Sequence, residues 1–390
     1  MRILVIAGYH YQGTLYPTAI FIHEQMLAYA RAGHEVKALV TIVCGKKDDY
    51  GRRITPSVWR QTVDGIEHIF MRRFSFSNYG HRGSLNLRCA RATLKRHMEE
   101  ILDGWTPDVI HGQALGNAYL GELLRERTGA ALVVTNHGET RCDLPWRVSP
   151  GRIAPMADRA DAVICVSSVL ERQLRELGVK TRLGTILNGF RVIPQEAAGE
   201  PPPVSLNYTG WLQELKKLDI SLTAFAALKR QYPDAAFTIV GRGRTEKEDR
   251  APRKLVEQLD LEDSVSFLGY LDNAAAISEM GKSRFFVMPS HPEGFGVAYL
   301  EAMSMGCVTI GTEGQGIADL IVSGENGFLV PPDDPEAIVK VISWCVEHPQ
   351  EADRIAERGR REAMSLTWDK NAAQYVRLFR TLREEDARCG

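Results

Sequence analysis

One stretch in the second half of the sequence constrains the fold more strongly than any other. The short, largely apolar run at 284–288 predicts a buried parallel strand. A glycine-rich turn follows at 293–296, and then comes a helical pattern at 297–305 that Gly306 can cap. A second apolar run at 308–310 predicts the next strand. Because strand, turn, helix and strand form one right-handed βαβ unit, the sequence predicts an α/β protein with parallel sheets.

The same alternation extends over most of the chain and is interrupted once. A proline-rich polar segment at 191–203 is typical of a linker. It separates a domain at 1–190 from one at 204–367, and an amphipathic helix is expected at 368–390. Two doubly wound parallel-sheet (Rossmann-like) domains are therefore predicted, facing across a cleft, with the ligand at the carboxyl ends of the strands. Further strands are expected at 1–7, 35–43, 66–72, 109–111, 131–135, 162–166, 185–187, 204–208, 236–240, 265–268 and 327–330, and helices at 18–32, 224–231, 253–259, 273–280 and 335–348.

Composition excludes several classes of protein. The 390 residues suffice for two domains with full cores, and the net charge of −1 gives no support to nucleic-acid binding. Seven cysteines, without a Cys-x-x-Cys pair, predict neither a disulfide framework nor a zinc site. The apolar run at 3–7 is too short for a signal peptide, and no stretch approaches the roughly 20 apolar residues of a spanning helix. A cytoplasmic location is expected.

Two carboxylates flank the glycine-rich turn. Glu293 stands just before the expected helix, and Glu301 stands on it eight positions later, so both could reach one ligand. The glycines let the backbone approach that ligand, and the helix start offers free N–H groups to a phosphate. The structural alternative makes Glu301 a solvated helix residue and Glu293 a favourable charge near a helix N-terminus.

The residues around this pair carry a family resemblance. Pro-Ser-x-x-Glu-Gly-Phe-Gly, followed by Glu-Ala-Met-x-x-Gly, resembles the Glu-x7-Glu motif of retaining, nucleotide-sugar-dependent glycosyltransferases of the group-1, or family 4, type. The resemblance implies the glycosyltransferase-B (GT-B) fold, in which the C-terminal helix crosses back onto the first domain. It also implies that Glu301 bonds the ribose hydroxyls of the donor. Glu293 would lie by the donor sugar, together with the backbone of Gly294, Phe295 and Gly296.

A second segment, 208–219, resembles the family's Gly-Arg-Leu-x-x-x-Lys-Gly-x-Asp, whose basic pair holds the donor diphosphate. Lys216 matches the lysine, whereas Trp211 stands where the arginine is expected and Lys217 replaces the glycine. Donor cleavage leaves negative charge on a nucleoside diphosphate, which fixed cations stabilise. Lys216 is thus expected at the diphosphate, although it could be a surface lysine in a basic turn. The sequence has no Asp-x-Asp, so no metal and no cofactor are expected.

Two further strand ends supply donor-side candidates. In the family, the turn after the strand at 236–240 and the turn that ends at Tyr270 frame the nucleobase. Gly241 and Arg242 lie in the first of these turns. Arg242 or Arg244 is a candidate for the positive charge missing at 211, and the alternative is that both are solvated.

The first domain supplies its own candidates. His137 follows an expected strand, and the family has a histidine at this point, near the donor sugar. It would polarise a sugar hydroxyl or orient the acceptor. His111 resembles the first histidine of a frequent family His-x-His, with Gln113 in the second place, and a structural role is favoured for it. Gly13, in a long loop, and Asn188, at the domain hinge, complete the acceptor-side candidates with His111.

The segment at 46–100 is basic, with 12 Lys and Arg against 6 Asp and Glu. Arg88, Arg91 and Lys95 fall on one helical face. This face is either a solvated helix surface or a peripheral contact with an anionic membrane, where each cation contributes about 1 kcal/mol.

Together these observations predict a hexosyltransferase-type glycosyltransferase. It would move a sugar from a nucleotide-diphosphate sugar, a UDP-sugar by family frequency, to a hydroxyl of a glycan or lipid-linked acceptor. Retention is implied by the resemblance alone. One alternative is a sugar-nucleotide epimerase on the same fold. Another, suggested by Trp211, is a sugar-nucleotide-binding protein that has lost catalysis.

Overall fold

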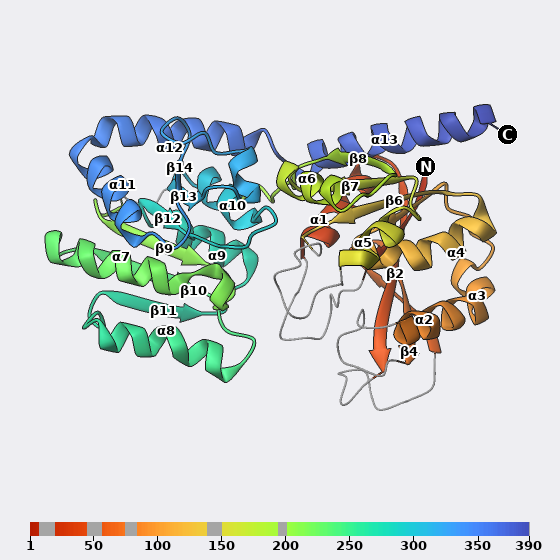
Figure 1. Cartoon of the computed structure of the whole chain (residues 1–390), viewed down its shortest axis with the longest axis horizontal. Coiled ribbons are helices and arrows are strands. Elements are labelled where there is room, and N and C mark those ends of the chain that lie inside the picture. The colour runs from red at the N-terminus through yellow and green to blue at the C-terminus, as the bar shows by residue number, and fades with distance from the viewer. Residues whose placement is uncertain (8–19, 45–56, 75–83, 139–149, 194–200, 390) are drawn as a thin grey trace. The chain divides into compact units, whose positions relative to one another are not determined.

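The computed structural model describes residues 1–7, 20–44, 57–74, 84–138, 150–193 and 201–389. The chain divides into two compact units (Figure 1). Unit 1 consists of Met1–Gly189 together with Trp368–Gly390, and unit 2 of Phe190–Thr367. Each unit is a sheet with helices packed on it, so the α/β prediction is confirmed.

Unit 1 is built on an eight-stranded sheet of order β3-β4-β2-β1-β5-β6-β7-β8. All described strand pairs are parallel except β3 with β4, an antiparallel edge pair whose outer strand is absent from the predicted strands. The missed strand belongs to a hairpin whose turn is Asp64-Gly65, with φ of 48° and 79°. Asp-Gly is the preferred dipeptide of a tight hairpin turn because both positions need positive φ. The strands are β1 Arg2–Ala7, β2 Glu35–Cys44, β3 Ser57–Val63, β4 Ile66–Phe74, β5 Val109–Gly112, β6 Ala131–Asn136, β7 Ala162–Cys165 and β8 Arg182–Thr185.

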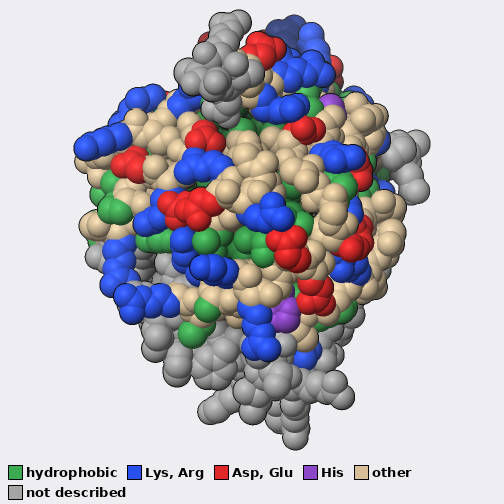
Figure 2. All heavy atoms as spheres, turned by 90° about the vertical axis from the view of Figure 1, so that its right-hand side faces the viewer, with side chains coloured by type: hydrophobic (Ala, Val, Ile, Leu, Met, Phe, Trp, Pro, Cys, Tyr) green, Lys and Arg blue, Asp and Glu red, His purple; other side chains and the backbone are tan. Residues whose placement is uncertain are grey.

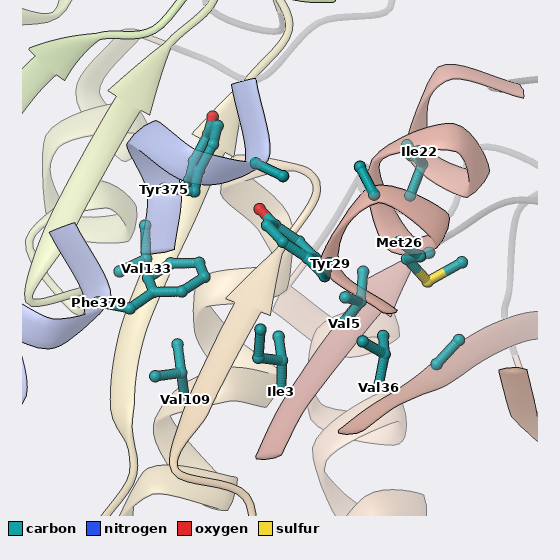
Figure 3. Close-up of a cluster of buried hydrophobic side chains, with 14 of the residues drawn as sticks. Ile3, Val5, Ile22, Met26, Tyr29, Val36, Val109, Val133, Tyr375 and Phe379 are labelled. Carbon is teal, nitrogen blue, oxygen red and sulfur yellow. The ribbon is translucent and has the colours of Figure 1, made fainter. Parts of the chain in front are cut away.

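The C-terminal helix α13, Trp368–Cys389, is part of the core of unit 1. Its buried residues recur at intervals of three and four, which gives one apolar stripe. Tyr375 and Phe379 from this stripe pack with Tyr29 of α1 and with Ile3 and Val133 of the sheet (Figure 3). The other helices of unit 1 are α1 Ile20–Arg31, α2 Ser84–Arg96, α3 Met98–Leu102, η1 Leu115–Asn117, α4 Ala118–Thr128, α5 Pro150–Ala157 and α6 Ser168–Glu176.

Unit 2 has a six-stranded sheet of order β11-β10-β9-β12-β13-β14, parallel throughout its described pairs. Counted within the unit, this is the order 3-2-1-4-5-6 of dinucleotide-binding folds. The order reverses between β9 and β12, and ligands of such sheets bind outside the carboxyl ends of the strands at that point. The strands are β9 Ser205–Thr209, β10 Ala236–Val240, β11 Val265–Gly269, β12 Phe285–Val287, β13 Val308–Thr312 and β14 Phe328–Val330.

The helices of unit 2 extend beyond several of the predicted segments. The helix predicted at 253–259 begins at Glu246, because the hydroxyl of Thr245 caps it by accepting from the backbone N–H of Glu248 at 3.3 Å. The helix that starts at Pro349 is absent from the predicted helices, the last of which before it ends at His348. The helices are η2 Glu214–Lys216, α7 Leu218–Gln231, α8 Glu246–Gln258, α9 Asn273–Met280, α10 Val297–Ser304, η3 Gly316–Asp319, α11 Pro335–Glu347 and α12 Pro349–Met364.

Candidate active site

The loops after β9 and β12 meet at the reversal point of the unit 2 sheet. The backbone N–H of His291 donates to the carbonyl of Leu215 at 2.9 Å. The hydroxyl oxygen of Ser290 lies 3.2 Å from the same carbonyl oxygen. These contacts hold the loop that carries Lys216 against the loop that carries Glu293. The two segments that resemble family motifs, 208–219 and 289–306, therefore come together.

The carboxylate of Glu293 accepts several hydrogen bonds. Lys216 Nζ donates to its Oε2, and Ser290 Oγ donates to the same oxygen at 3.0 Å. The side chains of Lys216 and Glu293 are 17% and 13% exposed, so little water competes with the pair. Burial by itself would raise the pKa of Glu293, but Lys216, Ser290 and the Gly294 N–H together hold that pKa below its usual value. Glu293 is thus a fixed negative charge beside a fixed cation.

The glycine-rich turn packs backbone to backbone against the loop after β13. A Cβ at Gly316 would lie 1.8 Å from the carbonyl oxygen of Gly294, so this approach requires glycine. The side chain of Gln315, from the same loop, accepts from the Glu293 N–H at 2.9 Å. Gly296, at φ +85°, leads directly into α10. Phe295 is 2% exposed, so its side chain packs inside the unit.

Glu301 lies on α10 in a different environment. Its Oε1 accepts from Asn273 Nδ2 at 2.9 Å, and the described residues provide no cation bonded to it. Burial raises its pKa from 4.5 to about 6, and the Asn273 bond lowers it only in part. The two glutamates of the motif therefore differ, since one carboxyl is held charged and the other is ionised only above about pH 6.

Two arginines that follow β10 lie over aromatic rings. The guanidinium of Arg244 lies 5.3 Å from the ring centre of Trp211, and that of Arg242 lies 4.7 Å from the ring centre of Tyr270. Gly241 has a φ of +138°, and a Cβ there would meet the Gly210 carbonyl oxygen at 1.8 Å. The turn after β10 is thus pressed onto the turn after β9. This packing places the guanidinium of Arg244 over Trp211, the residue that stands where the family has an arginine.

The other departure from the family motif has a backbone cause. Lys217 has a φ of 55°, which is the left-handed conformation that glycine adopts without strain. The family's glycine therefore suits this position, and Lys217 occupies it at some cost in energy. Its ammonium pairs with Asp333 at 2.8 Å.

In unit 1, His137 follows β6 and is part of a polar network. Its Nε2 lies 2.9 Å from Gln113 Oε1, and its ring centre lies 4.8 Å from that of Phe21. Burial lowers the pKa of His137 to about 4, so the ring is neutral at pH 7.

His111 lies within the core of unit 1. It is 0% exposed, Nε2 lies 2.8 Å from Thr135 Oγ1, and burial lowers its pKa to about 3. Such surroundings are those of a core histidine, and they give no support to its assignment as an acceptor-side residue. Asn188 is also buried, 7% exposed, at the end of unit 1. Gly13 lies outside the described residues.

The structure thus brings Lys216 and Glu293 together within unit 2, and His137 and His111 together within unit 1. Ser290, Asn273 and Gln315 bond the predicted site residues but were not predicted themselves. Ser290 was visible as part of Pro-Ser-x-x-Glu, whereas Asn273 gave no sequence signal, because it reaches Glu301 through a packing contact.

The basic segment was predicted as either a solvated face or a membrane contact. Arg91 donates to Glu122 at 2.7 Å, so it is part of an ion pair, whereas Arg88 and Lys95 are exposed. On the face shown in Figure 2, Lys and Arg side chains lie interspersed with Asp and Glu. No described helix is both long and apolar enough to cross a membrane. Nor do three metal-ligating side chains cluster anywhere in the described ranges.

Comparisons with known proteins agree with this geometry. The family model for glycosyl transferases group 1 matches residues 193–362, and that for the glycosyl transferase 4-like domain matches residues 18–189. The chain is 24% identical over 402 residues to glycogen synthase from Mycobacterium tuberculosis, covering 97% of this chain and 94% of that protein.

Two solved structures share the fold. Sucrose-phosphate synthase from Thermosynechococcus elongatus superimposes with a TM-score of 0.75 at 22% identity, covering 98% of each chain. Anabaena HepE in complex with UDP and glucose gives a TM-score of 0.71 at 18% identity, covering 98% of this chain and 100% of that one. Fold and site together define a glycosyltransferase of the GT-B type. Within that class, the chain belongs to the glycosyl transferases group 1.

Proposed function

We propose that this glycosyltransferase takes a sugar from a nucleotide-diphosphate sugar, with a UDP-sugar as the preferred donor. It transfers the sugar to a hydroxyl acceptor and retains the anomeric configuration. The observation that carries the proposal is the largely buried Lys216–Glu293 pair at the reversal point of the unit 2 sheet. A mobile surface lysine would not suit a diphosphate site, whereas a fixed cation does. The UDP and glucose bound by HepE, which has a similar fold, support the choice of donor.

Each group has a chemical task in this proposal. The Lys216 ammonium has three N–H donors, so it can bond a phosphate oxygen and still keep Glu293 paired. Glu293 would face the donor sugar, and Glu301 would accept from the ribose hydroxyls. Arg244, over Trp211, would supply the second positive charge. No metal is needed, since these cations would neutralise the diphosphate.

The reaction would pass through an oxocarbenium-like transition state while the nucleoside diphosphate leaves. The acceptor hydroxyl would attack from the same face, and the leaving phosphate would take its proton. Glu293, bonded to Lys216 and Ser290, is a fixed charge, so we assign it electrostatic stabilisation and not covalent attack.

The acceptor is proposed to be a glycan or a lipid-linked glycan. A lipid-linked acceptor would require peripheral contact with the inner face of a membrane. Arg88 and Lys95, exposed on α2, are the described cations of the basic face that would make this contact.

The test is donor turnover in the presence of EDTA. Wild-type protein should release UDP from a UDP-sugar faster than GDP from a GDP-sugar, and NMR should show that the product keeps the anomeric configuration of the donor. Glu293→Gln should bind UDP normally but turn over slowly. Interconversion of the donor sugar would instead reveal an epimerase, and binding without turnover would reveal a catalytically inactive protein.

A further inference from the structure

A chain of buried side-chain amides links the C-terminal helix to His137. Asn371 on α13 donates from Nδ2 to the carbonyl oxygen of Leu187 at 2.8 Å. Gln25 Nε2 donates to Asn371 Oδ1 at 2.7 Å, and Gln113 Nε2 donates to Gln25 Oε1 at 2.7 Å. Gln113 Oε1 lies 2.9 Å from Nε2 of His137. The chain therefore joins residues that are far apart in the sequence.

The carbonyl oxygen of Leu187, at the end of this series of amides, fixes the direction of every hydrogen bond in the series. A backbone carbonyl can only accept, so Asn371 must turn its NH₂ group toward Leu187 and its oxygen toward Gln25. Gln25 must then present its NH₂ group to Asn371 and its oxygen to Gln113. By the same logic, Gln113 turns its oxygen toward His137. Reversing any one amide would set two acceptors or two donors face to face.

Burial makes this direction energetically strict. Asn371, Gln25 and Gln113 are 3%, 4% and 5% exposed, so water cannot replace a mismatched partner. An unpaired buried polar group costs about 1–3 kcal/mol, which is enough to disfavour a flipped amide strongly. The NH₂ group of Gln113 also lies 3.3 Å from His111 Nδ1, which fits the same orientation.

We propose that Asn371, Gln25 and Gln113 are positioning residues that keep the proton of His137 on Nε2 and leave Nδ1 as a hydrogen-bond acceptor. Nε2 faces an oxygen that can only accept, so the neutral ring must carry its proton there. Nδ1 can then accept from a hydroxyl but cannot donate. The C-terminal helix thereby sets the tautomer of a histidine that follows β6 of the same unit. Its use in catalysis rests on the proposed transferase function, in which that hydroxyl belongs to the donor sugar or the acceptor.

The experiment reads the ring itself and is independent of transfer activity. The full chain, labelled with ¹⁵N-histidine, is studied by NMR at pH 7.5, and the His137 signals are assigned by their loss in His137→Gln. We expect a protonated, pyrrole-type shift at Nε2 and an unprotonated, pyridine-type shift at Nδ1. A proton on Nδ1 would overturn the proposal without any further variant.

Variants at residues distant from His137 test whether the amides keep its proton on Nε2. Asn371→Leu removes the anchor without touching His137, so both nitrogen shifts should move toward the average of the two tautomers. Val376→Ala, on the same helix and in the same core, should leave them unchanged. Equal shifts in these two variants, or no movement in Asn371→Leu, would refute the proposal.

A second pair of variants remains informative if Asn371→Leu does not fold. Gln113→Glu keeps an acceptor oxygen at the ring, so Nε2 should stay protonated, whether or not the new carboxylate also draws a proton to Nδ1. Gln113→Met keeps the length of the side chain but removes the acceptor, so the two tautomers should mix. Identical His137 shifts in these two variants would contradict the proposed role.

Discussion

The ammonium group of Lys216 donates a hydrogen bond to the carboxylate of Glu293, although the two residues are 77 positions apart in the chain. The loop after β9 provides the cation and the loop after β12 provides the anion. These strands are neighbours in the sheet because of the crossover at its reversal point. A single contact therefore joins the two segments that resemble separate family motifs.

Lys216→Met should lower both stability and turnover. It leaves a buried carboxylate without its partner, which typically costs about 3–5 kcal/mol. It also removes one preorganised cation from the proposed diphosphate site, for which a loss of about 10²–10³-fold in kcat/KM is expected. Chemical denaturation and donor turnover measure the two effects.

Two variants separate these effects. Lys216→Met with Glu293→Gln should regain stability but not turnover, because no buried charge is left unpaired. Lys217→Met, whose partner Asp333 is half exposed, should change stability by about 1 kcal/mol or less. Equal turnover in the Lys216 and Lys217 variants would mean that the diphosphate is held elsewhere.

Glu301→Gln should stabilise the ligand-free protein at pH 7.5. A pKa of about 6 against the usual 4.5 means that the folded state disfavours the charged carboxyl, at about 2 kcal/mol. In the wild type, stability from this group falls as pH rises from 4.5 through 6, so the gain in the variant should vanish below pH 4.5. Denaturation curves at several pH values check this.

The same substitution should weaken nucleotide binding, since the ribose loses a charged acceptor worth about 1.5–3 kcal/mol. Wild-type affinity for UDP should therefore fall as pH drops through 6, and that of Glu301→Gln should not.

Glu293→Gln is the matched control for the stability measurement, and its effect on stability should have the opposite sign. Its carboxyl has a lowered pKa, so its replacement should destabilise the protein at pH 7.5. Equal stability changes in both variants would contradict this division of roles.

Arg244→Ala should reduce kcat/KM by about 10²–10³-fold, as expected for the loss of one electrostatic donor. Its guanidinium lies over Trp211, where the family has an arginine, whereas Arg242 lies over Tyr270. Arg242→Ala should therefore be milder. The rescue is the decisive measurement, because Trp211→Arg should restore much of the activity lost in Arg244→Ala. Arg250, which pairs with Glu246 on the surface, is the control, and its alanine variant should behave like wild type.

If a lipid-linked acceptor is used, the protein should bind anionic vesicles and salt should release it. Arg88→Ala with Lys95→Ala should weaken this binding by about 2 kcal/mol, at about 1 kcal/mol for each cation. Replacing the exposed Arg250 and Arg354 of unit 2 should have little effect. Equal binding to neutral vesicles, measured by co-sedimentation, would count against the electrostatic contact.

The sequence by itself was enough to predict the α/β class, the βαβ unit around the glycine-rich turn and the glycosyltransferase family. These depend on local patterns, namely apolar runs of strand length, positions that need glycine and carboxylates at a fixed spacing. The hairpin at Asp64-Gly65 was equally local, and its turn dipeptide could have predicted the antiparallel strand β3.

Only the tertiary structure decided how these groups are charged and oriented. Glu293 and Glu301 share one motif, yet Lys216 holds the first ionised and burial raises the pKa of the second to about 6. The amide chain from Asn371 to His137 likewise joins α13 and α1 to the loops that follow β5 and β6. Desolvation and hydrogen bonding depend on which side chains meet in space, and strand order brings together residues that no spacing along the chain relates.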